Sequence, residues 1–303
     1  MEQKTDKIGV LYAAFAYVVW GLLPIYWKII DDVPAGEILA HRIIWSFIFM
    51  IVVVLVMRKW RGFIKECIRI MKDKKKLISI TLASVVISLN WLIYIWAVNS
   101  DHVLQASLGY YINPLVSILL AIIVLKEKLT KSQTVSVILA GIGVLYLTIS
   151  YGVFPWVSLV LAFSFALYGL FKKMVDIPAM YGLTIETMIV TPIALIYLGF
   201  IPVHSFSVQN ITSTENLFLI GAGAMTAIPL LLFSSGAKRI PLAMVGILQY
   251  IAPTLMLFIG VFMYHETFTT EHLIAFSFIW VALVIYLGSI YRFPIRKLKL
   301  PER

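Results

Sequence analysis

Two charged side chains lie within stretches of the sequence that are otherwise apolar, and they are the first candidates for chemistry. Arg42 follows Pro34 by eight residues, and Glu186 follows Pro178 by the same distance. A charge among apolar side chains is costly unless it is paired, so it is a functional candidate by default. Arg42 is expected either to bind an anionic group or to hold two helices together by donating to helix carbonyls. Glu186 is either a buried carboxyl that carries a proton or a solvated one near the boundary of its stretch.

Uncharged polar and aromatic side chains form a second set of candidates. Asn90 and Tyr94 are four residues apart, so they share one face of a helix, and Trp91 adjoins that face. A buried amide needs a hydrogen-bonding partner. Asn90 therefore bonds either to a neighbouring helix or to a bound solute, and both interpretations remain open. Trp20, within the first apolar stretch, is either a packing residue or part of a cavity wall.

Two prolines lie near the centre of long apolar stretches and have polar neighbours. Pro114 and Pro253 each free a backbone carbonyl and bend a helix. At membrane depth such a carbonyl is tolerated only where protein or a cavity satisfies it. The prediction is a pair of hinges beside a central cavity, and kinks that serve packing alone are the alternative. The side chains expected to line that cavity are Trp20, Asn90, Trp91, Tyr94, Tyr110, Tyr111, Asn113, Gln249 and Tyr250.

Ten apolar stretches must position these residues. Each is long enough, at about 1.5 Å per residue, to cross a hydrocarbon core of about 30 Å. The composition agrees, since 61% of the residues are hydrophobic and only 13% are charged, against about 25% charged in soluble proteins. The chain is therefore predicted to be an all-α membrane protein with ten transmembrane helices. The stretches are 9–30, 37–57, 77–99, 103–125, 132–150, 154–173, 182–202, 216–236, 241–264 and 270–291.

The basic residues fall almost entirely in alternate gaps between these stretches. Of the 25 Lys and Arg residues, 23 lie in the two terminal segments or in the gaps 58–76, 126–131, 172–181 and 237–240. By the positive-inside rule these gaps and both termini face the cytoplasm. The net charge of +10 thus belongs to short connecting loops and not to a nucleic-acid-binding surface. The densest gap, 58–76, is expected to be a loop that orients the protein, or one that also touches anionic lipid headgroups.

The two halves of the chain repeat each other. An offset of 139 residues pairs Pro114 with Pro253 and aligns the stretches around them. Each half holds five stretches, and because five is odd the second half enters the membrane from the opposite face. The prediction is two inverted five-helix repeats, residues 1–150 and 151–303. Secondary transporters often use this construction, and a repeat that serves only as a scaffold is the alternative.

The remaining polar residues predict little chemistry. Glu127 and Glu266 precede threonines and new apolar stretches, so they are interpreted as structural turns at helix starts. Cys67 is the single cysteine, which excludes a disulfide within the chain and a cysteine metal site. No cofactor and no metal site is predicted.

Several short motifs of the first half resemble a known family. They are Trp20 with Gly21, Arg42, the run 127–130 (Glu-Lys-Leu-Thr) and the run 140–144 (Ala-Gly-Ile-Gly-Val). Together they resemble the EamA-type domain of the drug/metabolite transporter superfamily. The second half carries the pattern more weakly, because Glu186 stands where the first half has the arginine.

A longer and more specific resemblance covers 90–114. This run includes Asn90-Trp91 and ends in Gly-Tyr-Tyr-Ile-Asn-Pro. It is similar to the RarD-type branch of the same superfamily, whose members are bacterial inner-membrane proteins. The resemblance implies a ten-helix bundle with a central cavity in a bacterial plasma membrane. It does not supply a substrate.

The function predicted from these observations is secondary active transport of a small organic solute, a metabolite or a drug-like compound, by alternating access around a midplane cavity. No Gly-x-x-x-x-Gly-Lys-Ser/Thr run is present, so the driving force is expected to be a proton gradient or exchange. A membrane-embedded enzyme is one alternative, although the His-Glu-x-x-His and Gly-x-Ser-x-Gly motifs are absent. A channel or a non-transporting partner in a membrane assembly is the other. Solute identity, direction, coupling ion and oligomeric state do not follow from the sequence.

Overall fold

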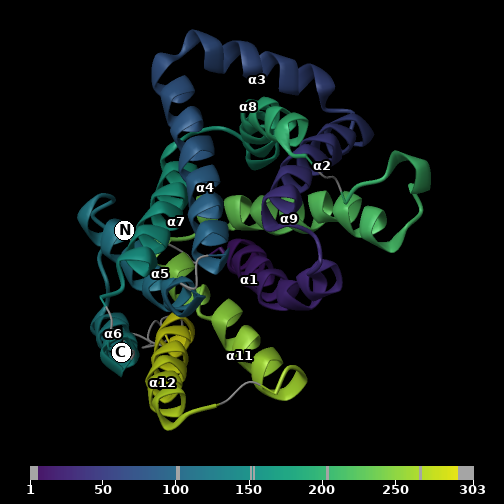
Figure 1. The fold of residues 1–303 in the computed structure, drawn as a ribbon. Helices are drawn as coiled ribbons and strands as arrows, with labels where there is room; N and C mark the ends of the chain where they lie inside the picture. Colours follow the sequence, from purple (N-terminus) through teal and green to yellow (C-terminus); the bar gives the residue numbers. More distant parts are fainter. Residues whose placement is uncertain are drawn as a thin grey trace, which may run out of the picture.

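The computed structural model describes residues 6–99, 103–150, 152, 154–202, 205–265 and 268–292, and its regular structure there is helical throughout. Figure 1 shows the helices in chain order. Their bounds are α1 Lys7–Trp27, η1 Lys28–Ile30, α2 Ala35–Val56, α3 Trp60–Lys72, α4 Lys74–Asn99, α5 Val103–Ile123, α6 Lys131–Ser150, α7 Trp156–Met174, α8 Ala179–Phe200, η2 Val208–Asn210, α9 Thr214–Arg239, α10 Leu242–Leu248, α11 Ile251–Met263 and α12 Thr270–Arg292.

The prediction of an all-α, multi-pass membrane protein is confirmed. Within the described residues, nine helical segments are long and apolar enough to cross a membrane, and Ser107–Ile123 in α5 is a further, shorter apolar helix. Each of the ten apolar stretches falls on one of these segments. The stretch 241–264 differs from the others because it holds two helices, α10 and α11.

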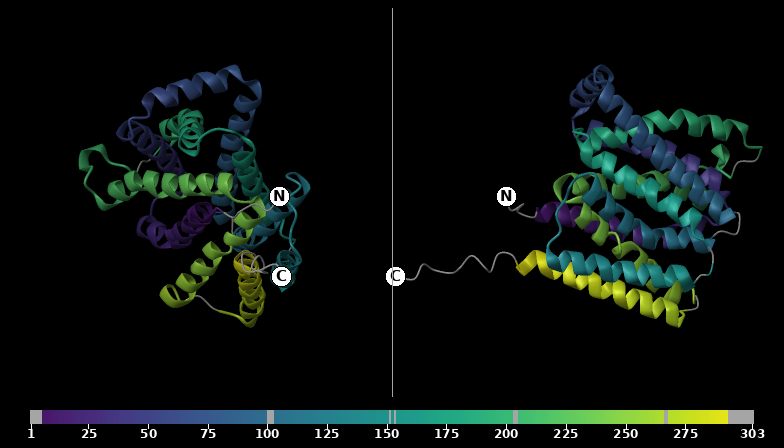
Figure 2. Two further views of the ribbon diagram at one scale, coloured as in Figure 1. Left: turned by 180° about the vertical axis from the view of Figure 1, so that it is seen from behind. Right: turned by 90° about the vertical axis from the view of Figure 1, so that its left-hand side faces the viewer.

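The long helices run roughly alongside one another in a single bundle, as the right-hand view of Figure 2 shows. In Figure 1, α6 and α12 pack together at one side of the bundle, whereas α2 and α8 pack together at the opposite side. Between these pairs, α1 packs against α9 and α11, α4 against α7, and α5 against α7 and α10. Helices from both halves of the chain are therefore interleaved throughout the bundle.

The gap 58–76, expected to be a loop, contains the helix α3, which crosses the end of the bundle in Figure 1. One apolar side of α3 is buried, with Phe63 and Ile70 packed in a cluster that includes Ile177 and Ile185. The sequence-based expectation was wrong because the density of charge obscured an amphipathic pattern. Burial of that apolar side stabilises a helix whose other side chains face outward.

The two central prolines have different effects on their helices. The helix α5 continues through Pro114. In the second half the chain leaves the helix at Gln249 and Tyr250, and α11 begins two residues before Pro253. Proline has no amide hydrogen, so Pro253 cannot donate to the carbonyl of Gln249 as a helix would require. That carbonyl instead accepts from the amide of Ala252 at 3.2 Å.

The interruption between α10 and α11 lies near Pro114. A Cβ atom built on Gly246 in α10 would come within 2.9 Å of both the carbonyl oxygen of Pro114 and Cγ1 of Ile118. Only glycine permits so close an approach of α10 to the backbone of α5. The helix α10, which precedes Pro253 in the sequence, therefore packs on the part of α5 that contains Pro114.

Candidate functional site

A small internal cavity lies between α2, α4, α7, α8 and α9. Its volume is about 20 Å³, which is enough for a single water molecule. Most of its wall is apolar, with three hydroxyl groups from serine and threonine and the carboxylate of Glu186. The lining residues are Ile43, Ser46, Ile87, Ser88, Trp91, Tyr168, Leu183, Glu186, Thr187, Val190 and Leu230.

Arg42 is held beside this cavity by two indole rings. Its guanidinium carbon lies 4.8 Å from the ring centroid of Trp27 and 5.1 Å from that of Trp91, one of the cavity-lining residues. Its Nε donates to Oγ1 of Thr226 in α9 at 3.0 Å. Cation–π contacts of this kind stabilise a partly desolvated guanidinium without neutralising it. Neither Trp27 nor Thr226 was predicted, because only the tertiary fold brings them to Arg42.

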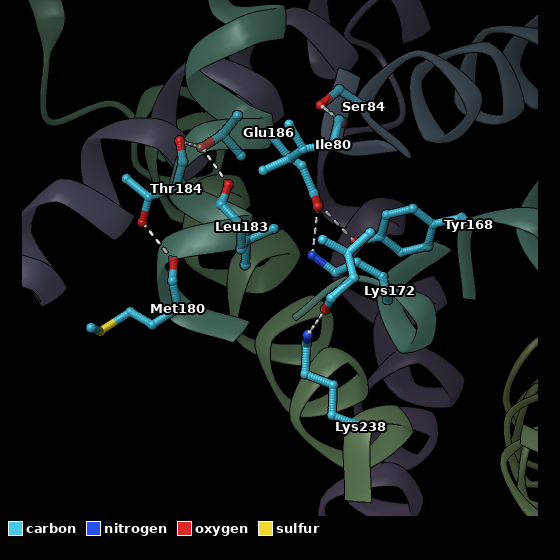
Figure 3. Close-up of polar contacts among 11 residues, drawn as sticks. Ile80, Ser84, Tyr168, Lys172, Met180, Leu183, Thr184, Glu186 and Lys238 are labelled. Carbon is cyan, nitrogen blue, oxygen red and sulfur yellow. Dashed lines mark hydrogen bonds and ion pairs between the residues drawn. The ribbon is translucent and has the colours of Figure 1, made fainter. Parts of the chain in front are cut away.

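Glu186 lies at another part of the same wall and is paired with a lysine. Its Oε1 accepts from Nζ of Lys172 at 2.7 Å, and its Oε2 accepts from the hydroxyl of Tyr168 at 3.2 Å. Figure 3 shows both side chains of α7 pointing toward the carboxylate on α8. Glu186 and Lys172 are each only 5% exposed. Glu186 is thus buried, and it is not a solvated boundary group.

The sequence analysis counted Lys172 among the charges of a connecting loop, and this was wrong. The structure places Lys172 inside α7, one helical turn after Tyr168. The spacing of four between these two residues was the available signal, because it puts them on one face of a helix. Their common partner, Glu186, comes from the next helix, so no local pattern predicts the pair.

Two further lysines join α7 to α9 near the Glu186 pair. Nζ of Lys173 donates to the carbonyls of Ala237 and Ile240. Nζ of Lys238 donates to the carbonyl of Val175. Each lysine thus satisfies carbonyl groups in or just after the last turn of the other helix, where helices leave carbonyls without partners. These bonds join the ends of α7 and α9.

Trp20 packs within an aromatic cluster that joins α1, α7 and α9. Its ring centroid is 5.6 Å from those of Phe165 and Phe233, and 5.5 Å from that of Tyr17. Tyr168, the partner of Glu186, stacks on Phe233 at 6.0 Å. The cluster therefore connects Trp20 to the Glu186 pair by way of packed rings.

Asn90 hydrogen-bonds a neighbouring helix. Its amide nitrogen donates to the carbonyl of Leu161 at 2.9 Å and to Oγ of Ser164 at 2.8 Å, both in α7. Of the two interpretations offered for this amide, the structure displays the interhelical one. Trp91, the next residue, faces the cavity and Arg42 instead.

The aromatic residues before Pro114 lie in two environments. The rings of Tyr94 and Tyr110 are 6.0 Å apart, and both are near enough to Arg42 to interact with its charge. Tyr111 is 9% exposed and meets Phe276 of α12 edge to face, at 5.4 Å between centroids. Asn113 is buried and accepts from Oγ of Ser117 at 3.4 Å.

Gln249 and Tyr250 form the interruption between α10 and α11. Gln249 is 6% exposed and Tyr250 is completely buried. The hydroxyl of Tyr250 has no hydrogen-bonding partner among the described residues. Of the residues predicted to line a central cavity, the structure thus puts Trp91 on the wall of the cavity described above, whereas these two lie at the helix break.

The carboxylate of Glu127 caps the N-terminus of a helix, α10, which belongs to the other half of the chain. The sequence analysis placed Glu127 in a turn that precedes the next helix of its own half. Its two oxygens accept from the backbone amides of Leu242 at 2.7 Å and Ala243 at 3.0 Å, in the first turn of α10. A carboxylate at a helix N-terminus satisfies free amides and interacts favourably with the helix dipole. Glu266 lies outside the described residues.

These features agree with what comparison with known proteins shows. Residues 7–149 and, separately, 155–288 match the profile of the EamA-like transporter family. The chain belongs to this family, so it is a multi-pass membrane transporter and not an enzyme.

Individual relatives cover almost the whole chain. It is 51% identical to the uncharacterized transporter YojE of Bacillus subtilis over 95% of this chain and 96% of that protein. It is 46% identical to the RarD protein of Escherichia coli K12 over 96% of this chain and 98% of that one. A crystal structure with 16% sequence identity superposes with a TM-score of 0.73 over 96% of this chain and 100% of the other, which shows a shared fold.

Proposed function

We propose that this protein is a secondary active transporter that moves a small organic solute across a bacterial plasma membrane by alternating access. Its two halves, residues 1–150 and 151–303, act as inverted five-helix repeats that rock around the interior between α2, α4, α7, α8 and α9. Both termini and the Lys172 end of the bundle face the cytoplasm. This orientation is supported by the distribution of Lys and Arg among the gaps.

The repeat is supported by matched backbone geometry in the two halves. Pro34 and Pro178 precede α2 and α8 with nearly the same dihedral angles, φ −53° and ψ 130° against φ −53° and ψ 135°. Lys126 and His265, which are 139 residues apart, both have positive φ, 55° and 54°. Positive φ is uncommon outside glycine. Two separate matches to one family profile point the same way.

The observation that carries the proposal is a cavity among helices from both halves, bordered by intramembrane charges. Side chains of α2 and α4 form one part of its wall, and side chains of α7, α8 and α9 form the rest. A cavity of about 20 Å³ is too small for an organic solute, so the proposed solute needs a conformation in which this space is larger. Movement of one half against the other would enlarge it toward one side at a time.

Glu186 is the group we propose to couple transport to protons. The carboxylate accepts hydrogen bonds from Lys172 and Tyr168, and its ion pair with Lys172 depends on its negative charge. Its protonation would weaken the ion pair at the wall of the solute cavity and favour separation of α7 from α8. The Lys173 and Lys238 bonds between α7 and α9 would then be the remaining contacts that keep this end closed.

The test is uptake into proteoliposomes that contain the full-length protein. A panel of metabolites is offered with and without an imposed pH difference, and with or without the same solute inside to allow exchange. We expect one chemical class to accumulate, and the pH difference to change its rate. Glu186→Gln should abolish the response to pH, whereas Glu215→Gln, which alters an exposed carboxylate at the start of α9, should preserve it.

Three results would count against parts of this proposal. Absence of flux for every solute, in a protein shown to be folded, would overturn transport. Flux that ignores the pH difference in the wild type would remove Glu186 as the coupling group. Wild-type selectivity in both Asn90→Ala and Tyr111→Ala would contradict the sequence-based prediction that these residues, with their neighbours Tyr110 and Asn113, line the solute cavity.

A further inference from the structure

We propose that Arg42 binds the carboxylate of the transported solute, so that the solute is an organic anion with an apolar body. The inference deepens the proposed function and rests on it. Its starting point is the incomplete set of contacts around the guanidinium. The only hydrogen bond it makes within the described residues is from Nε to Thr226.

The two terminal nitrogens of the Arg42 guanidinium, Nη1 and Nη2, have no hydrogen-bond acceptor in the described part of the chain. No carboxylate there lies within 4.0 Å of the guanidinium, and no described hydrogen bond involves Nη1 or Nη2. Oε1 of Glu37, five residues earlier on α2, accepts from the amides of Ser205 and Phe206, and Glu37 forms no ion pair with Arg42 among the described residues. A structural arginine would cap carbonyls or pair with a carboxylate, as Arg69 does with Asp176. Arg42 does neither.

The surroundings keep this charge in place without neutralising it. The indoles of Trp27 and Trp91 lie 4.8 Å and 5.1 Å from the guanidinium carbon, and Tyr94 and Tyr110 are close by. Rings stabilise a cation through their faces and leave its edge free for hydrogen bonds. A positive charge at membrane depth that the protein stabilises but does not pair is arranged for an anion from elsewhere.

The cavity beside Arg42 indicates the chemical character of the ligand beyond its charged group. The residue that follows it, Ile43, and the indole of Trp91 both line the internal cavity. Beyond them the wall is mainly apolar, with Ile87, Val190 and Leu230. A ligand that places its charged group at Arg42 would therefore extend an apolar body into this cavity as the cavity opens. The planar fork of arginine matches a carboxylate, to which it donates two parallel hydrogen bonds.

The binding experiment uses probes that share one apolar body and differ in the head group. They are phenylacetate, phenylacetamide and benzylphosphonate, with acetate as the head group alone. Each is titrated at constant ionic strength against the full-length protein in nanodiscs, and the dissociation constant is taken from the shift in thermal unfolding. We expect phenylacetate to bind at least about tenfold more tightly than phenylacetamide, because a charged hydrogen bond has no neutral equivalent.

Substitution of Arg42 then tests whether the carboxylate of the probe binds at this residue. Arg42→Gln should reduce the preference for phenylacetate over phenylacetamide to less than about twofold. Arg61→Gln, an exposed arginine of α3, is the matched control and should keep the wild-type preference. Arg42→Lys keeps the charge and removes the fork, so it should keep part of the preference. This variant provides the test if Arg42→Gln does not fold.

Several outcomes overturn the assignment. They are equal binding of the acid and the amide, an unchanged preference in Arg42→Gln, stronger binding of benzylphosphonate than of phenylacetate, and stabilisation by acetate as strong as by phenylacetate. Lack of binding by every probe at about 10 mM would overturn it as well. Carboxylate binding through Arg42 without flux in proteoliposomes would overturn transport instead, and flux of neutral solutes only would overturn the anion assignment while transport stands.

Discussion

Arg42 and Glu186 hold matching places in the two halves, eight residues after the proline that precedes their helix, yet their surroundings are opposite. Glu186 is buried with a lysine and a tyrosine as partners. Arg42 is half-buried, lies against two indoles and has no carboxylate partner among the described residues. Two positions at the same distance from a helix-preceding proline thus hold a buried ion pair in one half of the chain and a charge without a carboxylate partner among the described residues in the other.

The largest expected effect on stability comes from breaking the buried ion pair between Lys172 and Glu186. Lys172→Met should lower the free energy of unfolding by about 3–5 kcal/mol, because it leaves the carboxylate of Glu186 buried without its cation. Adding Glu186→Met should restore most of this loss, since apolar side chains can replace a buried pair. Thermal and denaturant unfolding of the wild type, both single variants and the double variant provides a complete cycle.

The control for this cycle is Lys28→Met. Lys28 pairs with Asp31 on the surface, with side chains 62% and 50% exposed, and its loss should cost at most about 1 kcal/mol. If Lys172→Met cost no more than Lys28→Met, the contrast between a closed pair and an open charge would disappear.

A smaller effect is expected where α10 meets α5. Gly246→Ala should cost about 1–3 kcal/mol, because its methyl group would press on the carbonyl of Pro114 and on Ile118. Gly141→Ala in α6, where a Cβ atom meets nothing within 4 Å, should instead stabilise the protein by about 0.5–1 kcal/mol. Unfolding midpoints of the two variants measure both, and equal shifts would show that the contact between α5 and α10 is loose.

Arg42→Met should change the free energy of unfolding by less than about 1 kcal/mol, in contrast to Lys172→Met. It removes one hydrogen bond and two ring contacts, but it also removes the cost of holding a charge without a counterion. The same unfolding assay measures it. A loss near that of Lys172→Met would mean that Arg42 is a structural residue and would count against its role in solute binding.

The smallest effect concerns Cys67 in α3, and it shows which face of the membrane the Glu186 end occupies. Burial raises the pKa of the Cys67 thiol, so less reactive thiolate is present at neutral pH than for a free cysteine. Labelling by a membrane-impermeant maleimide should be slow at pH 7 and accelerate as pH rises. In oriented membranes it should require access from the cytoplasm, and labelling from the outside would reverse the proposed orientation.

The membrane helices were predictable because length and hydropathy alone determine them. The helix α3 was not, since the positive-inside count treats Arg58 to Lys76 as a loop and ignores the spacing of Trp60, Phe63 and Cys67 within it. The sequence singles out both prolines, but it does not distinguish Pro114, inside a continuous helix, from Pro253, which follows an interruption.

The charged residues of the candidate site could be picked out from the sequence, whereas the residues that contact them could not. Arg42 and Glu186 stand out because they are charges in apolar stretches. Lys172 was misassigned because it comes near the end of its helix, where basic residues are normally solvated, and only the neighbouring helix α8 shows why it is buried. The roles of Trp27 and Thr226 depend in the same way on contacts between helices that are distant in the sequence.

The interruption at Gln249 and Tyr250 has a consequence for the transport cycle. A carrier made of two interchangeable halves would spend equal time facing each side when nothing is bound. Here the first half contributes a continuous helix, α5, whereas the second half contributes two shorter helices, α10 and α11, separated by the interruption. In the proposed cycle the inward- and outward-facing forms would therefore not be mirror images, and the empty protein would prefer to face one side.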